Sequence, residues 1–233
     1  MNKSKSNKTK PLQRVPTVIA IGIAIIMMMF ISGCGKWVLR ANFNEYDLNP
    51  SGQQLVGDIK GKPDGDRIAM NITCVDVKVL NGDPNSLRIQ NCTSGVEIIP
   101  SDHDSPAEYF IDWEGTRKFP QNTLLTFISF RGEGQGFTLR FLTGKLDILV
   151  GGEPDVGSID VSSFSSHDIR LEIKIGENAA VDFFYQEKFS DGTKGPNITR
   201  SFSLSNFTKL TEIVISAEEF AAYTISDLDV FAK

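Results

Sequence analysis

A strict alternation of apolar and polar residues is the feature that most limits how this chain can fold. It is clearest in the segment HDIRLEIKI at residues 167–175. Ile169, Leu171 and Ile173 fall on one side of an extended backbone, and Asp168 and Arg170 fall on the other, because successive side chains of a strand point to opposite faces. The segment therefore predicts a β-strand with one face in a hydrophobic core.

The same alternation recurs through the second half of the chain. We expect strands at residues 124–131, 137–141, 145–150, 180–185, 210–216 and 223–231. Turns rich in Gly or Asn separate them, and only SAEEFAAY at residues 216–223 is expected to form a short helical turn. Many short strands at intervals of about 8 to 12 residues, each with one apolar face, are typical of two antiparallel sheets packed face to face.

The predicted fold class is therefore all-β, an antiparallel, jelly-roll-like β-sandwich that occupies residues 37–233 as a single domain. The 16 Phe residues suit its interior, because a Phe ring fills a core without needing a polar partner. We expect the last strand, residues 224–231, to return and pair near the first, residues 37–43.

The strands from HDIRLEIKI through AVDFFY to the closing ISDLDVF resemble those of the concanavalin A-like lectin and glucanase sandwiches. The resemblance implies a carbohydrate-related sandwich. Enzymes of the glucanase type carry paired acids in a Glu-x-Asp-x-x-Glu strand, whereas RLEIKI and KLDILV carry one acid each. We therefore predict no catalytic residue and a non-catalytic binding module for a carbohydrate or an envelope partner, with a glycan-acting hydrolase as the alternative.

The N-terminus has the layout of an export signal. Five basic residues and no acidic ones precede or flank the apolar run VIAIGIAIIMMMFI at residues 18–31, whose 14 residues are fewer than the roughly 20 that a membrane-spanning helix needs. The exit Ile31-Ser32-Gly33-Cys34 resembles the lipobox of bacterial lipoproteins. That resemblance implies a signal helix in a signal peptide of residues 1–33, lipidation of Cys34, and a short tether of residues 34–36. An ordinary thiol after an uncleaved signal anchor is the alternative.

The net charge of the mature protein limits which classes of partner it can bind. Cleavage after residue 33 would leave 19 basic against 29 acidic residues, a formal charge of −10. Nucleic-acid binding needs clustered Lys and Arg, so we expect none. We expect the lipid to hold the protein to the bacterial cell envelope. Gly35 follows the cysteine where an Asp would resemble an inner-membrane retention signal, which favours the outer membrane if the source has one, and otherwise the outer face of the cell membrane.

Cys74 and Cys92 form an even pair in a compartment that permits disulfides. The residues between them predict a hairpin centred on Asp83, which places the two cysteines opposite each other. The same register pairs Val77 with Ile89 and Val79 with Leu87. The cysteines have the opposite parity from these apolar residues, so the bridge should lie on the more polar face or be shifted by a bulge. Two separate reduced cysteines in the core are the alternative.

Trp113 lies between Asp112 and Glu114 and is the sugar-binding candidate, because a flat ring and carboxylate acceptors suit a sugar face and its hydroxyls. Core packing is the alternative for this ring. His103, in SDHDSP, fits a polar turn better than a calcium site, and we predict neither a metal nor a cofactor. His167 and the adjacent Asp168 should point to opposite faces of a strand, so they should not form an orienting pair.

Overall fold

The computed structural model describes residues 35–41, 53–54, 57–60, 69–72, 74, 76–80, 86–100, 105–118, 126–162 and 166–233. The predicted signal peptide, Cys34 and His103 lie outside these residues. Every helix or strand among the described residues is a β-strand, and each strand pairs antiparallel to its neighbours. This part of the chain therefore contains no helix of the length and hydrophobicity that crossing a bilayer would require.

The strands follow one another along the described chain in this order: β1 (Lys36–Ala41), β2 (Gln53–Gln54), β3 (Gly57–Lys60), β4 (Ala69–Ile72), β5 (Val77–Leu80), β6 (Ser86–Ile99), β7 (Glu108–Lys118), β8 (Thr126–Glu133), β9 (Phe137–Leu142), β10 (Lys145–Val150), β11 (Glu153–Asp160), β12 (Ser166–Lys174), β13 (Asn178–Lys188), β14 (Ile198–Ser205) and β15 (Lys209–Ala232).

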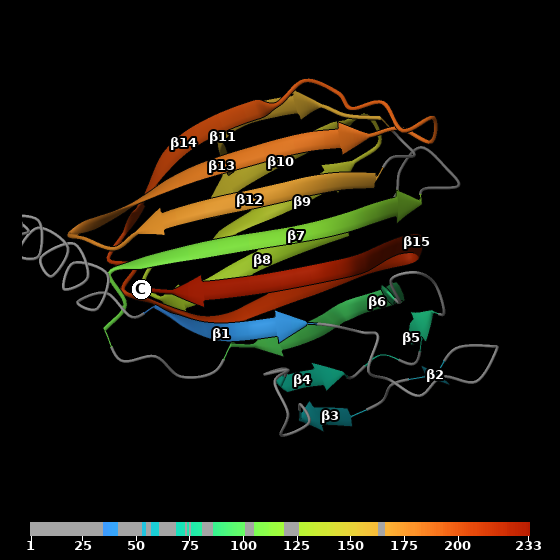
Figure 1. The fold of residues 1–233 in the computed structure, drawn as a ribbon, viewed down its shortest axis with the longest axis horizontal. Coiled ribbons are helices and arrows are strands. Elements are labelled where there is room, and N and C mark those ends of the chain that lie inside the picture. The colour runs from blue at the N-terminus through green and yellow to red at the C-terminus, as the bar shows by residue number, and fades with distance from the viewer. Residues whose placement is uncertain are drawn as a thin grey trace, which may run out of the picture. The chain divides into compact units, whose positions relative to one another are not determined.

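Two layers arise because the long strand β15 belongs to both of them. Its first half pairs with β8, which continues through β9 and β10 to β11, and we call this layer the back sheet. Its second half pairs with β7, which continues through β12 and β13 to β14, and we call this layer the front sheet. Figure 1 shows β7, β12, β13 and β14 in front of β8 to β11. The prediction of an all-β, antiparallel sandwich is confirmed.

The first and last strands pair as the sequence predicts. Lys36 of β1 lies opposite Ala232 of β15, and Trp37 lies opposite Phe231. The predicted helical turn at residues 216–223 is wrong, because β15 runs through it as a strand whose register shifts between Ala217 and Ala222. The buried alanines there pack in the core where the strand passes from one sheet to the other, so tertiary packing outweighs the local helix propensity of Ala and Glu.

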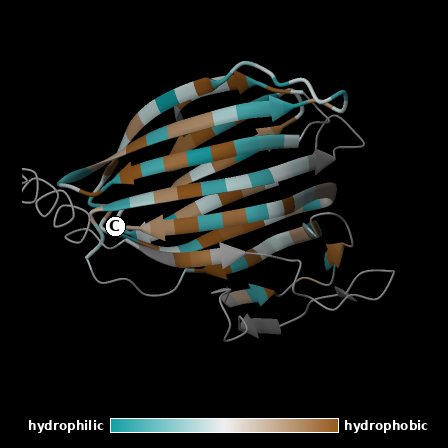
Figure 2. Ribbon diagram, in the orientation of Figure 1, coloured by the Kyte–Doolittle hydropathy of each residue, from teal (hydrophilic) through white to brown (hydrophobic). Residues whose placement is uncertain are grey.

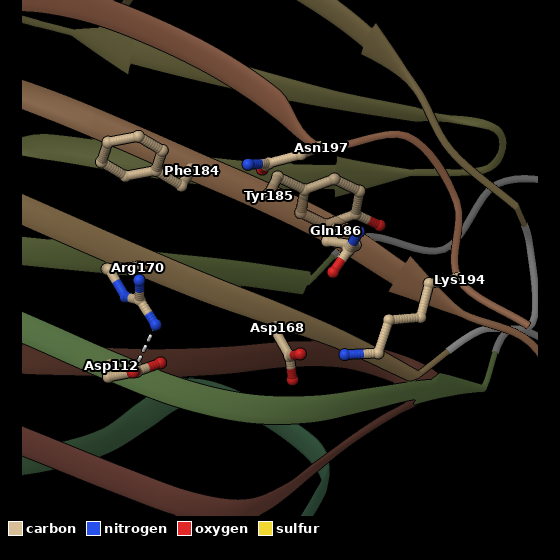
Figure 3. A pocket seen from close by; sticks show the side chains of 8 residues that line it. All are labelled: Asp112, Asp168, Arg170, Phe184, Tyr185, Gln186, Lys194 and Asn197. Carbon is tan, nitrogen blue, oxygen red and sulfur yellow. Dashed lines mark hydrogen bonds and ion pairs between the residues drawn. The ribbon is translucent and has the colours of Figure 1, made fainter. Parts of the chain in front are cut away.

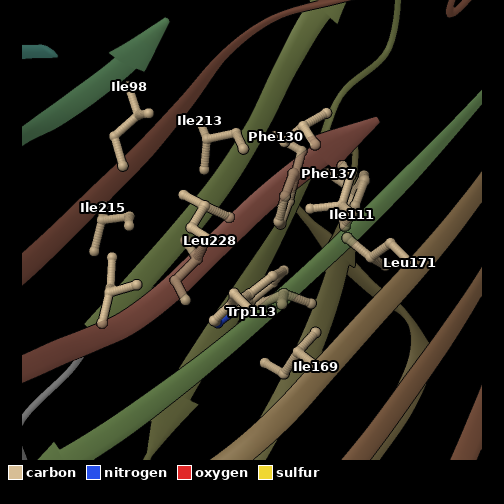
Figure 4. Close-up of a cluster of buried hydrophobic side chains, with 14 of the residues drawn as sticks. Ile98, Ile111, Trp113, Phe130, Phe137, Ile169, Leu171, Ile213, Ile215 and Leu228 are labelled. Atoms are coloured by element: carbon tan, nitrogen blue, oxygen red, sulfur yellow. The ribbon is translucent and has the colours of Figure 1, made fainter. Parts of the chain in front are cut away.

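The inner faces of the two sheets meet through aromatic rings. Trp113 of β7 lies 5.6 Å from Phe130 of β8 between ring centroids, and Phe141 of β9 stacks on His167 of β12 at 5.2 Å. Figure 4 shows the buried cluster around Trp113, and Figure 2 shows hydrophobic and hydrophilic residues alternating along the strands that surround it. The alternation read from the sequence thus builds one core between the sheets.

Three buried side chains of the front sheet form a hydrogen-bonded network in this core. The indole N–H of Trp113 donates to the Tyr223 hydroxyl at 3.0 Å, and that hydroxyl lies 2.8 Å from Nε2 of His167. All three side chains are buried. Residue 115 must be Gly for this packing, because a Cβ there would overlap the Tyr223 hydroxyl and lie 3.0 Å from Nε2 of His167. This network connects β7, β12 and β15, which are neighbouring strands of the front sheet.

The outer face of the back sheet holds a partly buried ion pair. Arg140 of β9 donates to Asp147 of β10 at 2.7 Å, and the Ser158 hydroxyl donates to the same carboxylate at 2.6 Å. Burial raises the pKa of Asp147, but the hydrogen bonds from Ser158 and Arg140 and the charge of Arg140 outweigh it, so the pKa lies below its ordinary value of 3.8. The ionised form of Asp147 therefore stabilises the fold.

The Cys74–Cys92 disulfide is confirmed, with Cα atoms 5.3 Å apart. β5 and β6 have the predicted register, Val77 opposite Ile89 and Val79 opposite Leu87. Asn91 has a positive φ of 48°, and this irregularity reverses the parity of β6 immediately before Cys92. Cys92 is consequently buried in the same core as the valines, where Cys74 is buried as well, which is the bulge-shifted form of the prediction.

Candidate functional site

The outer face of the front sheet carries a row of charged side chains from strands far apart in the sequence. Register places Asp112 of β7 opposite Arg170 of β12, and Glu114 of β7 opposite Asp168 of β12. These four side chains point away from the core because their neighbours Ile111, Trp113, Ile169 and Leu171 point into it. The period-two pattern of both strands therefore produces a polar surface opposite the apolar one.

The neighbouring strands extend the row on both sides. β13 places Phe184 opposite Arg170 and Gln186 opposite Asp168. β15 places Asp229 opposite Asp112 and Asp227 opposite Glu114. The row therefore crosses four strands roughly at right angles to their direction.

Two adjacent depressions follow this row and share Asp112, Asp168 and Arg170 in their walls. The first has a volume of about 220 Å³ and extends over β13 to Lys194 and Asn197, as Figure 3 shows. The second has a volume of about 240 Å³ and extends over β7 to the acidic residues of β15. We call the two together the front groove.

Lys188 is the best-connected cation beside the front groove. Its Nζ lies 2.7 Å from Asp168 and 3.1 Å from Glu114. Burial lowers the pKa of Lys188, but the hydrogen bonds that Lys188 donates to Asp168 and Glu114 outweigh it and raise the pKa above its ordinary value of 10.5. Lys188 therefore stays charged and holds Asp168 and Glu114 in place.

Arg170 and Asp112 form a second, more exposed pair. Their atoms lie 3.3 Å apart, and their side chains are 61% and 57% exposed. Exposed pairs of this kind contribute about 0 to 1 kcal/mol to stability, so both groups can exchange this contact for a ligand at little cost. The described residues bring together no group of three or more His, Cys, Asp or Glu side chains that could hold a metal ion.

The three residues expected from the sequence as a sugar site separate in the structure. Asp112 and Glu114 line the front groove. The Trp113 side chain faces the core, is only 4% exposed, and packs on Phe130. Its ring therefore has no open face on which a sugar could stack, and the geometry fits the core-packing alternative.

The sequence did not predict the other groove residues, which are Asp168, Arg170, Phe184, Tyr185, Gln186, Lys194, Asn197, Asp227 and Asp229. The segment HDIRLEIKI indicated two of them, Asp168 and Arg170, because its charged residues fall on the face opposite the core. Which strands lie beside that face depends on pairing between distant segments. The sequence pattern alone does not specify this pairing.

No protein-family model matches the chain, and no curated protein sequence matches it. Among solved structures, the chain is similar to the binding domain of botulinum neurotoxin serotype C1, with 13% identity, a TM-score of 0.48, and coverage of 82% of this chain and 50% of that one. It is also similar to an alginate lyase from Corynebacterium sp., with 10% identity, a TM-score of 0.42, and coverage of 76% and 92%.

A third similar structure is the CBM2 module of the evolved Dit of Lactobacillus casei BL23 phage J-1, with 10% identity, a TM-score of 0.39, and coverage of 84% of this chain and 95% of that one. The chain spans about half the length of the toxin binding domain. Because all three TM-scores lie below 0.5 and the identities are 13% or lower, these matches assign no ligand or activity to this chain.

Proposed function

We propose that this chain is a lipid-anchored protein of the bacterial cell envelope that binds an oligosaccharide in the front groove. The proposed mature protein begins at Cys34 and carries the sandwich, for which we propose no catalytic step. The observation that carries the binding proposal is the front groove, in which four strands bring carboxylate acceptors together with the donors Arg170 and Gln186.

The shape of the groove favours an elongated ligand. Pockets for small molecules usually have volumes of about 300 to 1,000 Å³, and each depression is smaller than that. The two are adjacent and share Asp112, Asp168 and Arg170, so together they form an extended site. An oligosaccharide lying across the strands would fill both with successive sugar units.

The chemistry of the walls fits sugar hydroxyls. The carboxylates of Asp112 and Asp168 accept hydrogen bonds, Arg170 donates them, and the amide of Gln186 does both. The half-buried ring of Phe184 supplies an apolar surface for the C–H face of a sugar. Acidic residues outnumber basic ones along the groove, which favours neutral or cationic sugars over polyanionic ones.

A glycan array probed with the full-length protein in detergent tests this proposal. We expect binding to neutral or amino-sugar oligosaccharides. The Asp112→Ala, Arg170→Ala double variant should lose at least about tenfold in affinity, because it lacks two hydrogen bonds that the ligand would bury. Glu153→Ala is the matched control, because Glu153 is exposed on β11 of the other sheet. Equal affinities for the double variant and the control would refute the groove as the binding site, and capture of a single envelope protein instead of a glycan would favour a protein partner.

The glycan-acting hydrolase is the second candidate, and the proximity of two carboxylates favours it. Glu114 and Asp168 both contact Nζ of Lys188, at 3.1 and 2.7 Å, so their bonded oxygens lie close together. Retaining glycosidases place their two carboxyl groups about 5 to 5.5 Å apart. Both carboxylates are bound to the Lys188 ammonium group, however, so a substrate would have to displace this contact before either could act on a glycosidic bond. Release of reducing ends from a bound glycan, abolished by Glu114→Gln, would establish the enzyme.

A further inference from the structure

The point at which the chain enters the sandwich is fixed by packing. Gly35 lies against the ring of Phe231, and a Cβ at residue 35 would overlap that ring and lie 3.0 Å from the carbonyl oxygen of Ala232. The next residue, Lys36, already pairs with Ala232 in the sheet. The first described residue is therefore held against the end of the last strand.

Several turns lie at this same end of the sandwich. The backbone N–H of Lys233 donates to Glu108 at the start of β7, and that of Ile175 donates to Ala107. The hairpin between β12 and β13 and the C-terminus therefore lie beside the entry point, and Figure 1 shows the C-terminus there. The turn after β8 joins them, because Gln135 N–H donates to the carbonyl of Ser205 at the end of β14. We call this end, with residues 105–107, 133–136, 175–178, 205–208 and 233, the anchor end.

We propose that the anchor end rests on the surface of a phospholipid bilayer and that the front groove is held above that surface and parallel to it. This inference rests on the proposed lipid anchor at Cys34. Adjacent Cα atoms are 3.8 Å apart, so an acylated Cys34 would place the bilayer within one residue of Gly35. A tether of that length leaves the domain no room to turn its other end toward the lipid.

The height of the groove follows from the length of β12. Lys174 ends this strand at the anchor end, and Asp168 in the groove lies six residues before it. At about 3.3 Å per residue, the groove lies roughly 20 Å from the anchor end along the strand. Because the groove crosses the strands, a long glycan chain in it would run alongside the membrane.

Charge does not supply the contact with the bilayer. On or beside its turns, the anchor end carries both acidic and basic residues, among them Glu108, Glu133, Glu177, Lys174, Lys209 and Lys233. Opposite charges that are mixed in this way give little net attraction to anionic headgroups. The short tether is therefore the element that sets the orientation, which makes it the element to change in an experiment.

Protease protection tests the orientation in the full-length, lipidated protein bound to preformed vesicles of phosphatidylcholine. One variant carries a specific protease site inserted after Gly176, at the anchor end. A matched variant carries it after Ser190, in the turn that follows β13 at the opposite end. In detergent both sites should be cleaved. On vesicles, we expect cleavage after Ser190 to proceed at its detergent rate and cleavage after Gly176 to slow at least tenfold.

Lengthening the tether provides the control. A flexible Gly/Ser insertion of about 20 residues between Gly35 and Lys36 should restore cleavage after Gly176 while the protein still floats with the vesicles. Equal cleavage of the two sites on the natural tether would overturn the orientation. Failure of the protein to float with vesicles would instead refute the lipid anchor itself, so the two proposals fail in distinguishable ways. Hydrogen exchange of residues 175–178 in the unmodified protein, with and without vesicles, gives the same comparison without an insertion, and unchanged exchange would also overturn it.

Discussion

Replacing Tyr223 with Phe removes one oxygen from the centre of the core. The Trp113 indole N–H can only donate, so the Tyr223 hydroxyl accepts from it, and the proton of the hydroxyl is then available to Nε2 of His167. The variant keeps the ring, its volume and its contacts with Phe141 and His167. Tyr223→Phe thus tests the hydroxyl group with the ring retained.

The expected cost follows from the burial of the partners. Trp113 is 4% exposed and His167 is fully buried, so water cannot replace the lost hydroxyl without entering the core. A buried polar group that loses its partner costs about 1 to 3 kcal/mol. With two such groups affected, we expect Tyr223→Phe to lower the free energy of unfolding by about 2 to 4 kcal/mol.

Tyr185→Phe is the matched control. Tyr185 is as buried as Tyr223, but its hydroxyl donates to the partly exposed Glu187 at 3.2 Å, where solvent can take its place. We expect this variant to cost less than about 1 kcal/mol. Urea unfolding of the disulfide-intact protein, followed by tryptophan fluorescence, measures both values. A cost for Tyr223→Phe no larger than that for Tyr185→Phe would refute the reasoning.

Three further predictions concern the disulfide, a carboxylate and the anchor. Replacing Cys74 and Cys92 with Ala should lower the free energy of unfolding by about 3 kcal/mol in the chain-entropy model, measured by urea unfolding; an unchanged midpoint would contradict this. Asp147→Asn should flatten the loss of stability on acidification. The lowered pKa of Asp147 stabilises the wild type above about pH 3.8, and this stabilisation is lost as the pH falls through the folded-state pKa. Parallel plots of unfolding free energy against pH for the two proteins would argue against this. Cys34→Ala should abolish palmitate labelling and leave an unprocessed precursor, and continued labelling would exclude lipidation at Cys34.

The register of the disulfide hairpin could be predicted because local pattern and turn chemistry agree. Val77 and Val79 alternate with polar residues, Leu87 and Ile89 resume the alternation, and the intervening segment is dense in turn-forming residues. The reversal of parity at Asn91 could not be placed, because Asn is one of several residues that tolerate a positive φ and the sequence does not say which one adopts it.

The position of Trp113 shows how a pattern can outweigh a single residue type. Tyr109, Ile111 and Trp113 share one parity, and all three side chains are buried, whereas Asp112 and Glu114 have the other parity and lie on the outer face. The alternation of apolar and polar residues therefore predicts that the Trp113 ring lies on the buried face. The partners of Asp112 on neighbouring strands come from residues 58 and 117 positions away, and only the folded sheet brings them together.

The strand β15 also governs when this sandwich can form. It is the last strand in the chain, yet it pairs with β1, β6, β7 and β8, and it lies at the centre of both sheets. None of these strands has its β15 neighbour until residues 209–232 have been synthesised. Contacts between the first and last strands give the topology a high contact order, which slows folding. Closure of the two sheets is consequently a late event, because the strand that joins them is made after all the strands with which it pairs.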